Sequence, residues 1–370
     1  MTRLLHVVGA RPNFMKVAPV LRAPSPGAAV EHILVHTGQH YDAAMSATFF
    51  AELGIPEPDA NLGVGSGSHG VQTGKLLIEL DAAFDRFAPD WVVVYGDVNS
   101  TLAAALVAAK RGIRIAHVEA GVRSFDRSMP EEVNRVLTDQ LADLCLTPSA
   151  AADENLRREG VRAECIRCVG NVMVDTLDAL RPQAAASGAA TRLGVSEGPF
   201  AFATFHRAGN VDDPATLAEL LQALGEIARD MPVLFAVHPR TRQRIEASGL
   251  AAQAGKTRLL DPLGYLETVD LVSRAALVLT DSGGLQVETT ILGTRCLTAR
   301  PNTEWTETLT DGTNRLVAPR KGEMIAAARS ALSAGAKGGQ RPRPPLWDGR
   351  TAERILQAIV SHLPAGARSA

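Results

Sequence analysis

The sequence contains few cysteines, no long hydrophobic run and almost no net charge. Four cysteines occur in 370 residues, and the single C-x-x-C pair, Cys165 and Cys168, has no second cysteine pair or histidine pair at the spacing of a tetrahedral zinc site. Free cysteines of this kind are most often small, buried apolar side chains. We therefore expect neither a bound metal nor a redox role for them.

The apolar stretches are as long as a β-strand and shorter than a membrane-spanning helix. The chain enters the first of them at Leu4, without the layout of a signal peptide. A formal net charge of -2 and a charged fraction of 21% exclude an acidic tail and the basic footprint of a nucleic-acid-binding protein. We therefore expect a cytoplasmic protein with no nucleic-acid or membrane partner.

Strand-length apolar runs alternate with helix-length segments in two successive series. The first series begins at Leu4 and ends near Val169, and the second begins at Phe200 and ends at a Gly- and Pro-rich stretch, residues 334–345. Such alternation predicts βαβ units around parallel sheets, and 370 residues exceed the size of one hydrophobic core. We predict an α/β fold with two doubly wound, Rossmann-like domains, residues 1–169 and 170–350, facing each other across a cleft. A terminal helix within residues 351–370 is expected to pack on the first domain.

Three acids in the first half of the chain are candidates for proton transfer. Asp97 and Glu119 each follow an apolar run, and Glu131 opens a helix-length segment. Acids at the carboxyl ends of parallel strands lie where ligands bind, and mutual repulsion pushes their pKa values apart. Each acid can instead cap a helix. Glu131 stands three residues after Ser128, as in a capping box, and four before Arg135, as in a surface ion pair. Three acids at neighbouring strand ends favour catalysis over capping.

Two segments have the features of a phosphate site. Arg11 and Lys16 follow the first apolar run, where their cationic groups suit phosphate oxygens, unless both are solvated surface charges. Residues 280–288 give the stronger signal, because glycines leave the backbone N–H groups of a helix start accessible to a diphosphate. Glu288 can accept hydrogen bonds from ribose hydroxyls or simply complement the helix dipole. The predicted diphosphate site consists of Ser282, Gly283, Gly284 and Glu288.

His206 and Arg207 end another apolar run, in a loop that contains a glycine. Because the pKa of an imidazole is near neutrality, His206 can donate to a phosphate or carry a proton. A histidine at a strand end is structural about as often as it is functional. The neighbouring Arg207 favours a functional role here.

Seven motifs occur together along the chain: Gly9-Ala10-Arg11-Pro12, Thr37-Gly38-Gln39-His40, Gly96-Asp97, His117-Val118-Glu119-Ala120-Gly121-Val122-Arg123, Pro130-Glu131-Glu132-Val133-Asn134-Arg135, Asp281-Ser282-Gly283-Gly284 and Gly312-Thr313-Asn314. In this order they resemble the motifs of the non-hydrolysing UDP-N-acetylglucosamine 2-epimerases, over nearly the whole chain. The resemblance implies a fold similar to that of the GT-B glycosyltransferases and a homodimer. It also implies that no metal or nicotinamide cofactor takes part.

The same resemblance implies the interconversion of UDP-N-acetylglucosamine and UDP-N-acetylmannosamine. UDP leaves C1 while C2 loses its proton, giving 2-acetamidoglucal, and a proton and UDP then add back with C2 inverted. Carboxylates near C1 and C2 suit this reaction because they stabilise developing positive charge and carry the proton. The implied catalytic residues are Asp97, Glu119, Glu131 and His206. The implied substrate contacts are Arg11, Lys16, Arg207, Ser282, Gly283, Gly284 and Glu288, and the implied regulatory pair is Gln39 and His40.

Some segments leave the identity of the substrate open. Thr303-Glu304-Trp305 and His238-Pro239-Arg240-Thr241 are similar to the sister group that epimerises UDP-2,3-diacetamido-2,3-dideoxy-glucuronate. Residues 170–175 and Gly312-Thr313-Asn314 instead resemble the N-acetylglucosamine branch. A GT-B glycosyltransferase is a third alternative, because it shares the fold and the UDP site.

Overall fold

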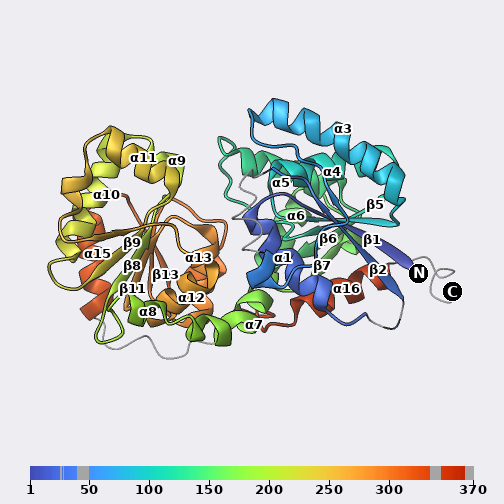
Figure 1. Cartoon of the computed structure of the whole chain (residues 1–370). Coiled ribbons are helices and arrows are strands. Elements are labelled where there is room, and N and C mark those ends of the chain that lie inside the picture. Colours follow the sequence, from blue (N-terminus) through green and yellow to red (C-terminus); the bar gives the residue numbers. More distant parts are fainter. Residues whose placement is uncertain (26, 28, 40–49, 334–342, 363–370) are drawn as a thin grey trace. The chain divides into compact units, whose positions relative to one another are not determined.

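The computed structural model describes residues 1–25, 27, 29–39, 50–333 and 343–362, which form two compact units (Figure 1). Unit 1 contains Met1–Asp178 and Pro345–Ala370, and unit 2 contains Ala179–Pro344. The division falls inside helix α7 (Val172–Ala186), a few residues after the expected boundary at residue 169. Each unit has a parallel sheet flanked by helices, which confirms the predicted α/β class.

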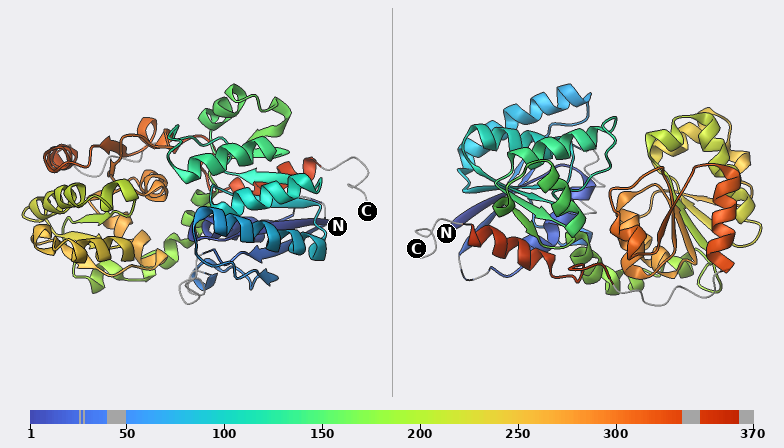
Figure 2. Two further views of the ribbon diagram at one scale, coloured as in Figure 1. Left: turned by 90° about the horizontal axis from the view of Figure 1, so that it is seen from above. Right: turned by 180° about the vertical axis from the view of Figure 1, so that it is seen from behind.

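Unit 1 is built on a seven-stranded sheet with the order β3-β2-β1-β4-β5-β6-β7. Val92, Val93 and Val94 of β4 have no exposed surface, because helices cover both faces of the sheet (Figure 2). Strands buried on both faces give the continuous apolar runs seen in the sequence. The elements are β1 (Thr2–Val8), α1 (Arg11–Arg22), β2 (Val30–His36), β3 (Ala60–Asn61), α3 (His69–Phe87), β4 (Trp91–Tyr95), α4 (Asn99–Lys110), β5 (Arg114–Val118), α5 (Pro130–Leu141), β6 (Leu144–Thr147), α6 (Ala150–Arg158), η1 (Ala163–Cys165), β7 (Ile166–Cys168) and α16 (Thr351–Ser361).

Unit 2 is built on a six-stranded sheet with the order β10-β9-β8-β11-β12-β13. Successive residues of its central strand β8 pack on opposite faces: Ala203 joins a core with Leu224 of α10, and Phe202 joins a core with Leu271 of α12. The elements are α8 (Ala189–Arg192), β8 (Ala201–Thr204), α9 (Ala208–Val211), α10 (Pro214–Ile227), β9 (Val233–Ala236), α11 (Pro239–Ala247), η2 (Ala251–Ala254), β10 (Arg258–Leu260), α12 (Tyr265–Arg274), β11 (Leu277–Thr280), α13 (Gly283–Leu292), β12 (Cys296–Ala299), α14 (Glu307–Thr310), β13 (Asn314–Val317) and α15 (Lys321–Ser333).

Each sheet has one point at which the strand order reverses. It lies between β1 and β4 in unit 1, and between β8 and β11 in unit 2. The connections on the two sides of such a switch point run in opposite directions, and doubly wound folds bind ligands in the crevice that this leaves at the carboxyl ends of the strands. The segments that follow these four strands are Gly9-Ala10, Gly96-Asp97, Phe205-His206-Arg207 and Asp281-Ser282.

The terminal helix α16 belongs to unit 1, where it contacts α1. Ala352, Ile355, Leu356 and Ile359, which the sequence places on one helix face, are buried. None of the helices within the described residues is long and apolar enough to cross a membrane. Over the same residues, no group of three or more His, Cys, Asp or Glu side chains is arranged to hold a metal ion.

Candidate active site

Glu119 lies at the carboxyl end of β5 in a left-handed backbone conformation, with a φ of +71°. For a residue other than glycine this conformation costs about 1 to 3 kcal/mol, and such strain is concentrated at functional sites. The Glu119 amide donates to the Leu146 carbonyl at 3.0 Å, which fixes the turn on the neighbouring strand β6. The sequence predicts Glu119 at a strand end, but it does not predict the strained backbone.

The Glu119 carboxylate is paired with Lys16 of α1. Its Oε1 accepts a hydrogen bond from Lys16 Nζ at 2.6 Å, and both side chains are almost fully buried. Its Oε2 is buried as well and has no hydrogen-bond partner among the described residues. Burial raises the pKa of Glu119, Lys16 opposes this effect and Asp97 adds to it, so the pKa lies above its ordinary value. One oxygen of this acid is thus held by a cation while the other is unused.

Gly96 makes room for the Lys16 and Glu119 pair. A Cβ atom at this position would lie 2.7 Å from Lys16 Nζ and 3.5 Å from Glu119 Oε1. The φ of Gly96 is +62°, a region in which side chains are rarely found. Only glycine therefore fits the turn between β4 and Asp97 without displacing the ion pair.

Asp97 follows this glycine and is held by two neighbouring residues of α5. Its carboxylate forms an ion pair with Arg135, and its carbonyl oxygen accepts a hydrogen bond from Asn134 Nδ2 at 2.9 Å. Arg135 also donates to Glu132 Oε2 at 3.0 Å. Asp97 is close enough to Glu119 to raise the pKa of that acid. The structure therefore brings together two of the three predicted acids, each with its own cation.

Glu131 is exposed in the first turn of α5, and neither structural role considered for it is present. The Ser128 amide donates to Asp126 Oδ1 at 3.0 Å, so the capping box is not formed. Arg135 pairs with Asp97 and Glu132, not with Glu131. The buried acid in the first turn of this helix is Glu132, which accepts hydrogen bonds from the backbone amides before the helix. The alternatives of a cap and a surface ion pair were therefore wrong for Glu131.

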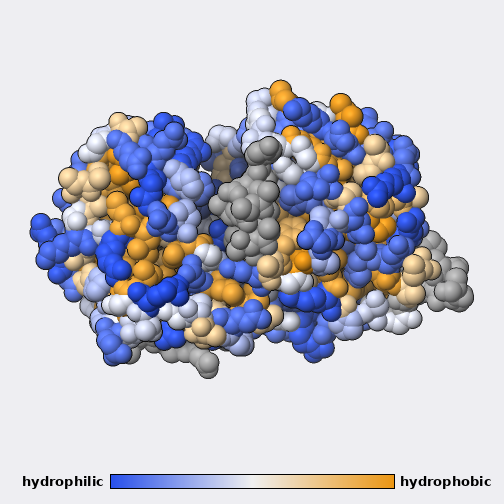
Figure 3. Space-filling model, viewed as in Figure 1, coloured by the Kyte–Doolittle hydropathy of each residue, from blue (hydrophilic) through white to orange (hydrophobic). Residues whose placement is uncertain are grey.

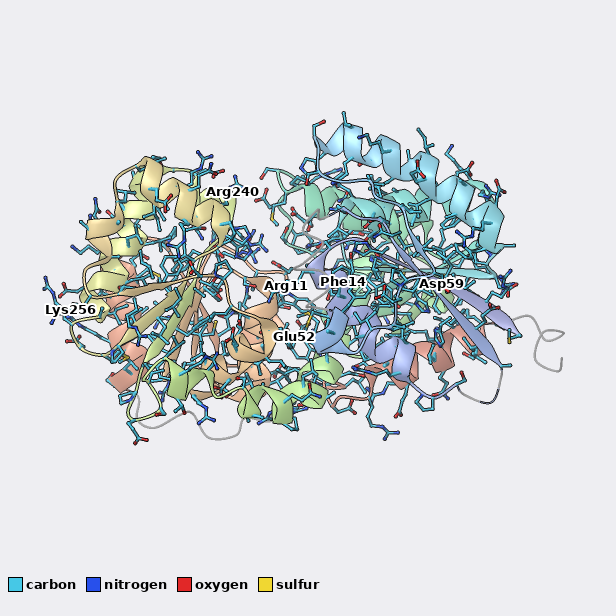
Figure 4. All side chains as sticks on the ribbon, in the orientation of Figure 1. Arg11, Phe14, Glu52, Asp59, Arg240 and Lys256 are labelled. Atoms are coloured by element: carbon cyan, nitrogen blue, oxygen red, sulfur yellow. The ribbon has the colours of Figure 1, made fainter. Side chains whose placement is uncertain are left out.

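Arg11 and Lys16 occupy different surroundings on the same helix. Arg11 is exposed at the first position of α1 (Figure 4), whereas Lys16 is 4% exposed and bonded to Glu119. Asn13 stabilises the turn between β1 and α1, because its Oδ1 accepts hydrogen bonds from the amides of Gly9 and Ala10 at 3.0 and 3.1 Å. Contacts of Arg11 and Lys16 with phosphate stay predictions.

Asp281 organises the switch point of unit 2. Its side chain is fully buried after β11, and it accepts hydrogen bonds from the amides of His206 and Arg207 and from Asn210 Nδ2. His206 Nδ1 lies 3.2 Å from Asp281 Oδ1, and the imidazole side chain is 40% exposed. The motif Asp281-Ser282-Gly283-Gly284 contains this residue, but no role of its own was predicted for it. A carboxylate that follows a buried β-strand directly was the available signal for its role.

The start of α13 presents backbone N–H groups, as the sequence predicts. Ser282 occupies the N-cap position, but its side chain forms no capping hydrogen bond. A Cβ atom on Gly283 would lie 2.7 Å from Glu304 Oε1. Glu288 is buried one turn further along this helix, and Gly284 is partly buried beside Gly283.

Glu304 joins two arginines beside this helix start. Arg207 Nη2 lies 3.3 Å from Glu304 Oε1, and Arg300 Nη2 lies 2.7 Å from Glu304 Oε2. Arg207 Nε also donates to the carbonyl oxygen of Asp281 at 3.0 Å. Two cations thus share one buried acid beside the N-terminus of α13, where an anion is favoured.

Gln39, the first member of the expected regulatory pair, is buried in the segment that follows β2. Its Oε1 accepts a hydrogen bond from the Ser100 amide at 3.2 Å. His40, the second member, lies outside the described residues.

Two doubly wound sheets, with charged side chains at the switch point of each, define a GT-B-like α/β enzyme. The family model described as UDP-N-acetylglucosamine 2-epimerase matches residues 25–360 of the chain. The chain therefore belongs to the UDP-N-acetylglucosamine 2-epimerase family, whose members are isomerases.

Relatives with related names match most of the chain. A UDP-2,3-diacetamido-2,3-dideoxy-D-glucuronate 2-epimerase from Pseudomonas aeruginosa is 44% identical over 334 residues, which are 89% of this chain and 92% of the relative. A UDP-N-acetylglucosamine 2-epimerase from Methanocaldococcus jannaschii is 40% identical over 366 residues, 97% of this chain and 99% of the relative. The crystal structure of a UDP-GlcNAc 2-epimerase from M. jannaschii, in complex with UDP-GlcNAc and UDP, has a TM-score of 0.89 at 39% identity and covers 97% of this chain and 100% of its own.

Proposed function

We propose that this protein interconverts UDP-N-acetylglucosamine and UDP-N-acetylmannosamine by inverting C2. The observation that carries the proposal is the buried Oε2 of Glu119, which has no hydrogen-bond partner among the described residues and belongs to an acid with a raised pKa. Such an oxygen is suited to take a proton from a carbon and to return it near neutral pH.

We assign the sugar chemistry to unit 1. The C2–H bond breaks, its electron pair forms the C1=C2 double bond, and the C1–O electron pair leaves with UDP. Glu119 takes the proton, while Asp97, held by Arg135, stabilises the positive charge that develops at C1. In the return step a proton reaches the opposite face of C2 as UDP adds to C1. Glu131, which is exposed at the start of α5, is assigned to deliver that proton.

We assign the UDP moiety to unit 2. The Ser282 hydroxyl, the backbone N–H groups of Gly283 and Gly284 and the nearby Arg207 suit the diphosphate, and Glu288 suits the ribose hydroxyls. His206 is oriented by Asp281 and is exposed enough to donate to the departing phosphate oxygen. Stabilising that oxygen matters because UDP departs with its electron pair.

The second candidate substrate is UDP-2,3-diacetamido-2,3-dideoxy-glucuronate. It is favoured by the Pseudomonas aeruginosa relative of that name and by the Thr303-Glu304-Trp305 segment. In the structure this segment packs against Gly283, where a Cβ atom would meet both Glu304 and Trp305. The reaction at C2 is the same for both substrates, so the catalytic assignments do not depend on the choice.

The proposal is tested by incubating the protein with UDP-N-acetylglucosamine in deuterated water and following C2 by NMR. Deuterium at C2 together with both epimers is the expected result, and the Glu119→Gln variant serves as the inactive control. Unlabelled, unchanged substrate contradicts the proposal, unless the diacetamido-glucuronate reacts in a parallel sample. Release of UDP only when a sugar acceptor is added identifies a glycosyltransferase instead.

We also propose that the chain forms a homodimer through α3 and α5, which both contact α4. Val71 and Ile78 on α3 are 55% and 71% exposed, and hydrophobic side chains reach the surface over α3 in Figure 3. Val133 and Leu137 lie one turn apart on α5 and are also exposed. Contact with a second copy removes such surface from water.

Light scattering should give twice the chain mass, and Ile78→Lys should give the monomer. A monomeric parent protein contradicts the dimer, and a dimeric variant contradicts this surface.

A further inference from the structure

His117 lies beneath the turns that carry Asp97 and Glu119. It belongs to β5, and its side chain is fully buried. Its Nδ1 is 2.6 Å from Oδ1 of Asp139 on α5, and its Nε2 is 2.7 Å from the carbonyl oxygen of Gly96. A carboxylate and a carbonyl are both hydrogen-bond acceptors, so each ring nitrogen has to donate.

Two donating nitrogens make this ring an imidazolium ion, because a neutral imidazole carries only one N–H. The alternative is a proton on Asp139, which would then donate to Nδ1. Against this, Arg123 Nη2 lies 2.6 Å from Asp139 Oδ2, and the Gly121 amide donates to the same oxygen at 3.0 Å. Oδ2 of Asp139 thus accepts from two donors, one of them a cation, which favours the carboxylate form of this acid. These contacts place the proton on His117.

The surrounding groups balance this buried charge. Arg123 also pairs with Glu159 at 2.6 Å, so the two cations His117 and Arg123 face the two anions Asp139 and Glu159. The Cys145 thiol lies against the Asp139 carbonyl oxygen, and burial raises the pKa of that thiol, which keeps it uncharged. With the partly exposed Glu159 included, the cluster has no net charge when the ring carries a proton on both nitrogens.

His117 and Asp139 bond to each other, and each also bonds to the backbone of one of the two turns that carry Asp97 and Glu119. His117 holds Gly96, the residue before Asp97, and Asp139 holds the amide of Gly121, two residues after Glu119. The backbones of Gly96, Glu119 and Gly121 all have positive φ values, +62°, +71° and +76°. Conformations of this kind persist only when the surrounding contacts fix them.

We propose that His117 is a positioning residue that donates from both ring nitrogens, to Asp139 and to the Gly96 carbonyl, and thereby sets the separation of Asp97 and Glu119. The role in catalysis rests on the proposed function, in which those two carboxylates act on C1 and C2 of the sugar. A displacement of about 1 Å in such groups lowers a rate by about a hundredfold.

The protonation state is tested by NMR of the histidine side chains in the full-length protein labelled with nitrogen-15. One imidazole, assigned by its absence in His117→Gln, should show hydrogen on both ring nitrogens under the conditions of the epimerisation assay. A ring that carries a single N–H under these conditions overturns the proposal. This measurement requires no substrate, so it stands or fails separately from the proposed reaction.

The positioning role is tested by comparing His117→Gln with Asp139→Asn. Glutamine cannot donate to both acceptors in the geometry of the ring, so His117→Gln should lower kcat by about a hundredfold and leave KM nearly unchanged. In Asp139→Asn the amide donates to a neutral Nδ1 while Nε2–H still reaches Gly96. This variant should therefore keep most of kcat although its ring has lost the second N–H.

Two controls separate positioning from folding. Near-ultraviolet circular dichroism shows whether each variant is folded, and calorimetric titration with UDP shows whether the α13 site of unit 2 is intact. If folded His117→Gln keeps its kcat, or if folded Asp139→Asn loses as much kcat as His117→Gln, the positioning role is wrong. If the parent protein inverts no UDP-sugar in deuterated water, the proposed function fails while the NMR result on the ring still holds.

Discussion

Replacing Lys16 with methionine removes the only cation bonded to Glu119 among the described residues. The Lys16 Nζ to Glu119 Oε1 distance is 2.6 Å, and both groups are nearly buried. Opposite charges 4 Å apart attract by about 4 kcal/mol at an effective dielectric constant of 20, and one pKa unit corresponds to about 1.4 kcal/mol. Loss of Lys16 should therefore raise the pKa of Glu119 by about two to three units.

The expected consequence is a shift in the pH dependence of epimerisation. If ionised Glu119 takes the C2 proton, kcat/KM rises as this carboxyl loses its proton. In Lys16→Met that rise should occur at a pH higher by about two to three units, with the loss at neutral pH recovered in alkaline solution. The assay is the initial rate of C2 inversion between pH 5.5 and 9.5. Arg22→Met, which removes a cation from the same helix but not from the site, is the matched control.

Stability gives a second, independent measure of the same change. A carboxyl group whose pKa is raised in the folded state binds more protons folded than unfolded, so stability falls as pH rises above its unfolded value. Lys16→Met should lose about 1.4 kcal/mol per pH unit between the ordinary value of 4.5 and the raised pKa. A pH–rate profile that keeps its midpoint, with a uniform loss at every pH, would refute the assignment of Glu119 as the titrating base.

Three further predictions concern other parts of the chain. Glu131→Gln should lower kcat by about a hundredfold or more without changing the melting temperature, because Glu131 is exposed; a lower melting temperature with normal kcat would make it structural. Gly283→Ala should weaken UDP binding by about tenfold or more in calorimetry, because its Cβ meets Glu304 at 2.7 Å, whereas Gly209→Ala, with no atom within 4 Å, should bind normally. Burial lowers the pKa of His6 well below 6.5, so stability should fall by about 1.4 kcal/mol per unit as pH drops below 6.5, and His6→Gln should flatten that slope in urea titrations.

The sequence predicts the interior of both sheets better than their edges. The central strands are buried on both faces and therefore appear as continuous apolar runs. The edge strands of the two sheets, β3, β7, β10 and β13, are each only two to four residues long. A short edge strand has a neighbour on one side only, so its sequence carries little signal of pairing.

The motifs located the candidate site, but they did not give the pairing of its charges. Lys16 and Glu119 are 103 residues apart and meet only because β1 and β5 flank β4 in the sheet. The capping box at Ser128 failed for a different, local reason, since Asp126 accepts from the Ser128 amide from two residues away. Local spacing predicts where a helix begins, whereas the partner of a charged side chain depends on the whole sheet order.

The three acids of unit 1 differ most in what surrounds them, and this difference suggests how they divide the reaction. Asp97 has Arg135 as a fixed counter-charge, which suits an acid that remains ionised and stabilises positive charge at C1. Glu119 has one oxygen on Lys16 and one buried oxygen without a partner, together with a raised pKa, which suits an acid that gains and loses a proton. Glu131 is exposed, so solvent can renew its proton. Inversion requires two proton carriers on opposite faces of C2, and the proposed roles of Glu119 and Glu131 meet this requirement. Solvent deuterium should therefore enter at C2 during every inversion that Glu131 completes.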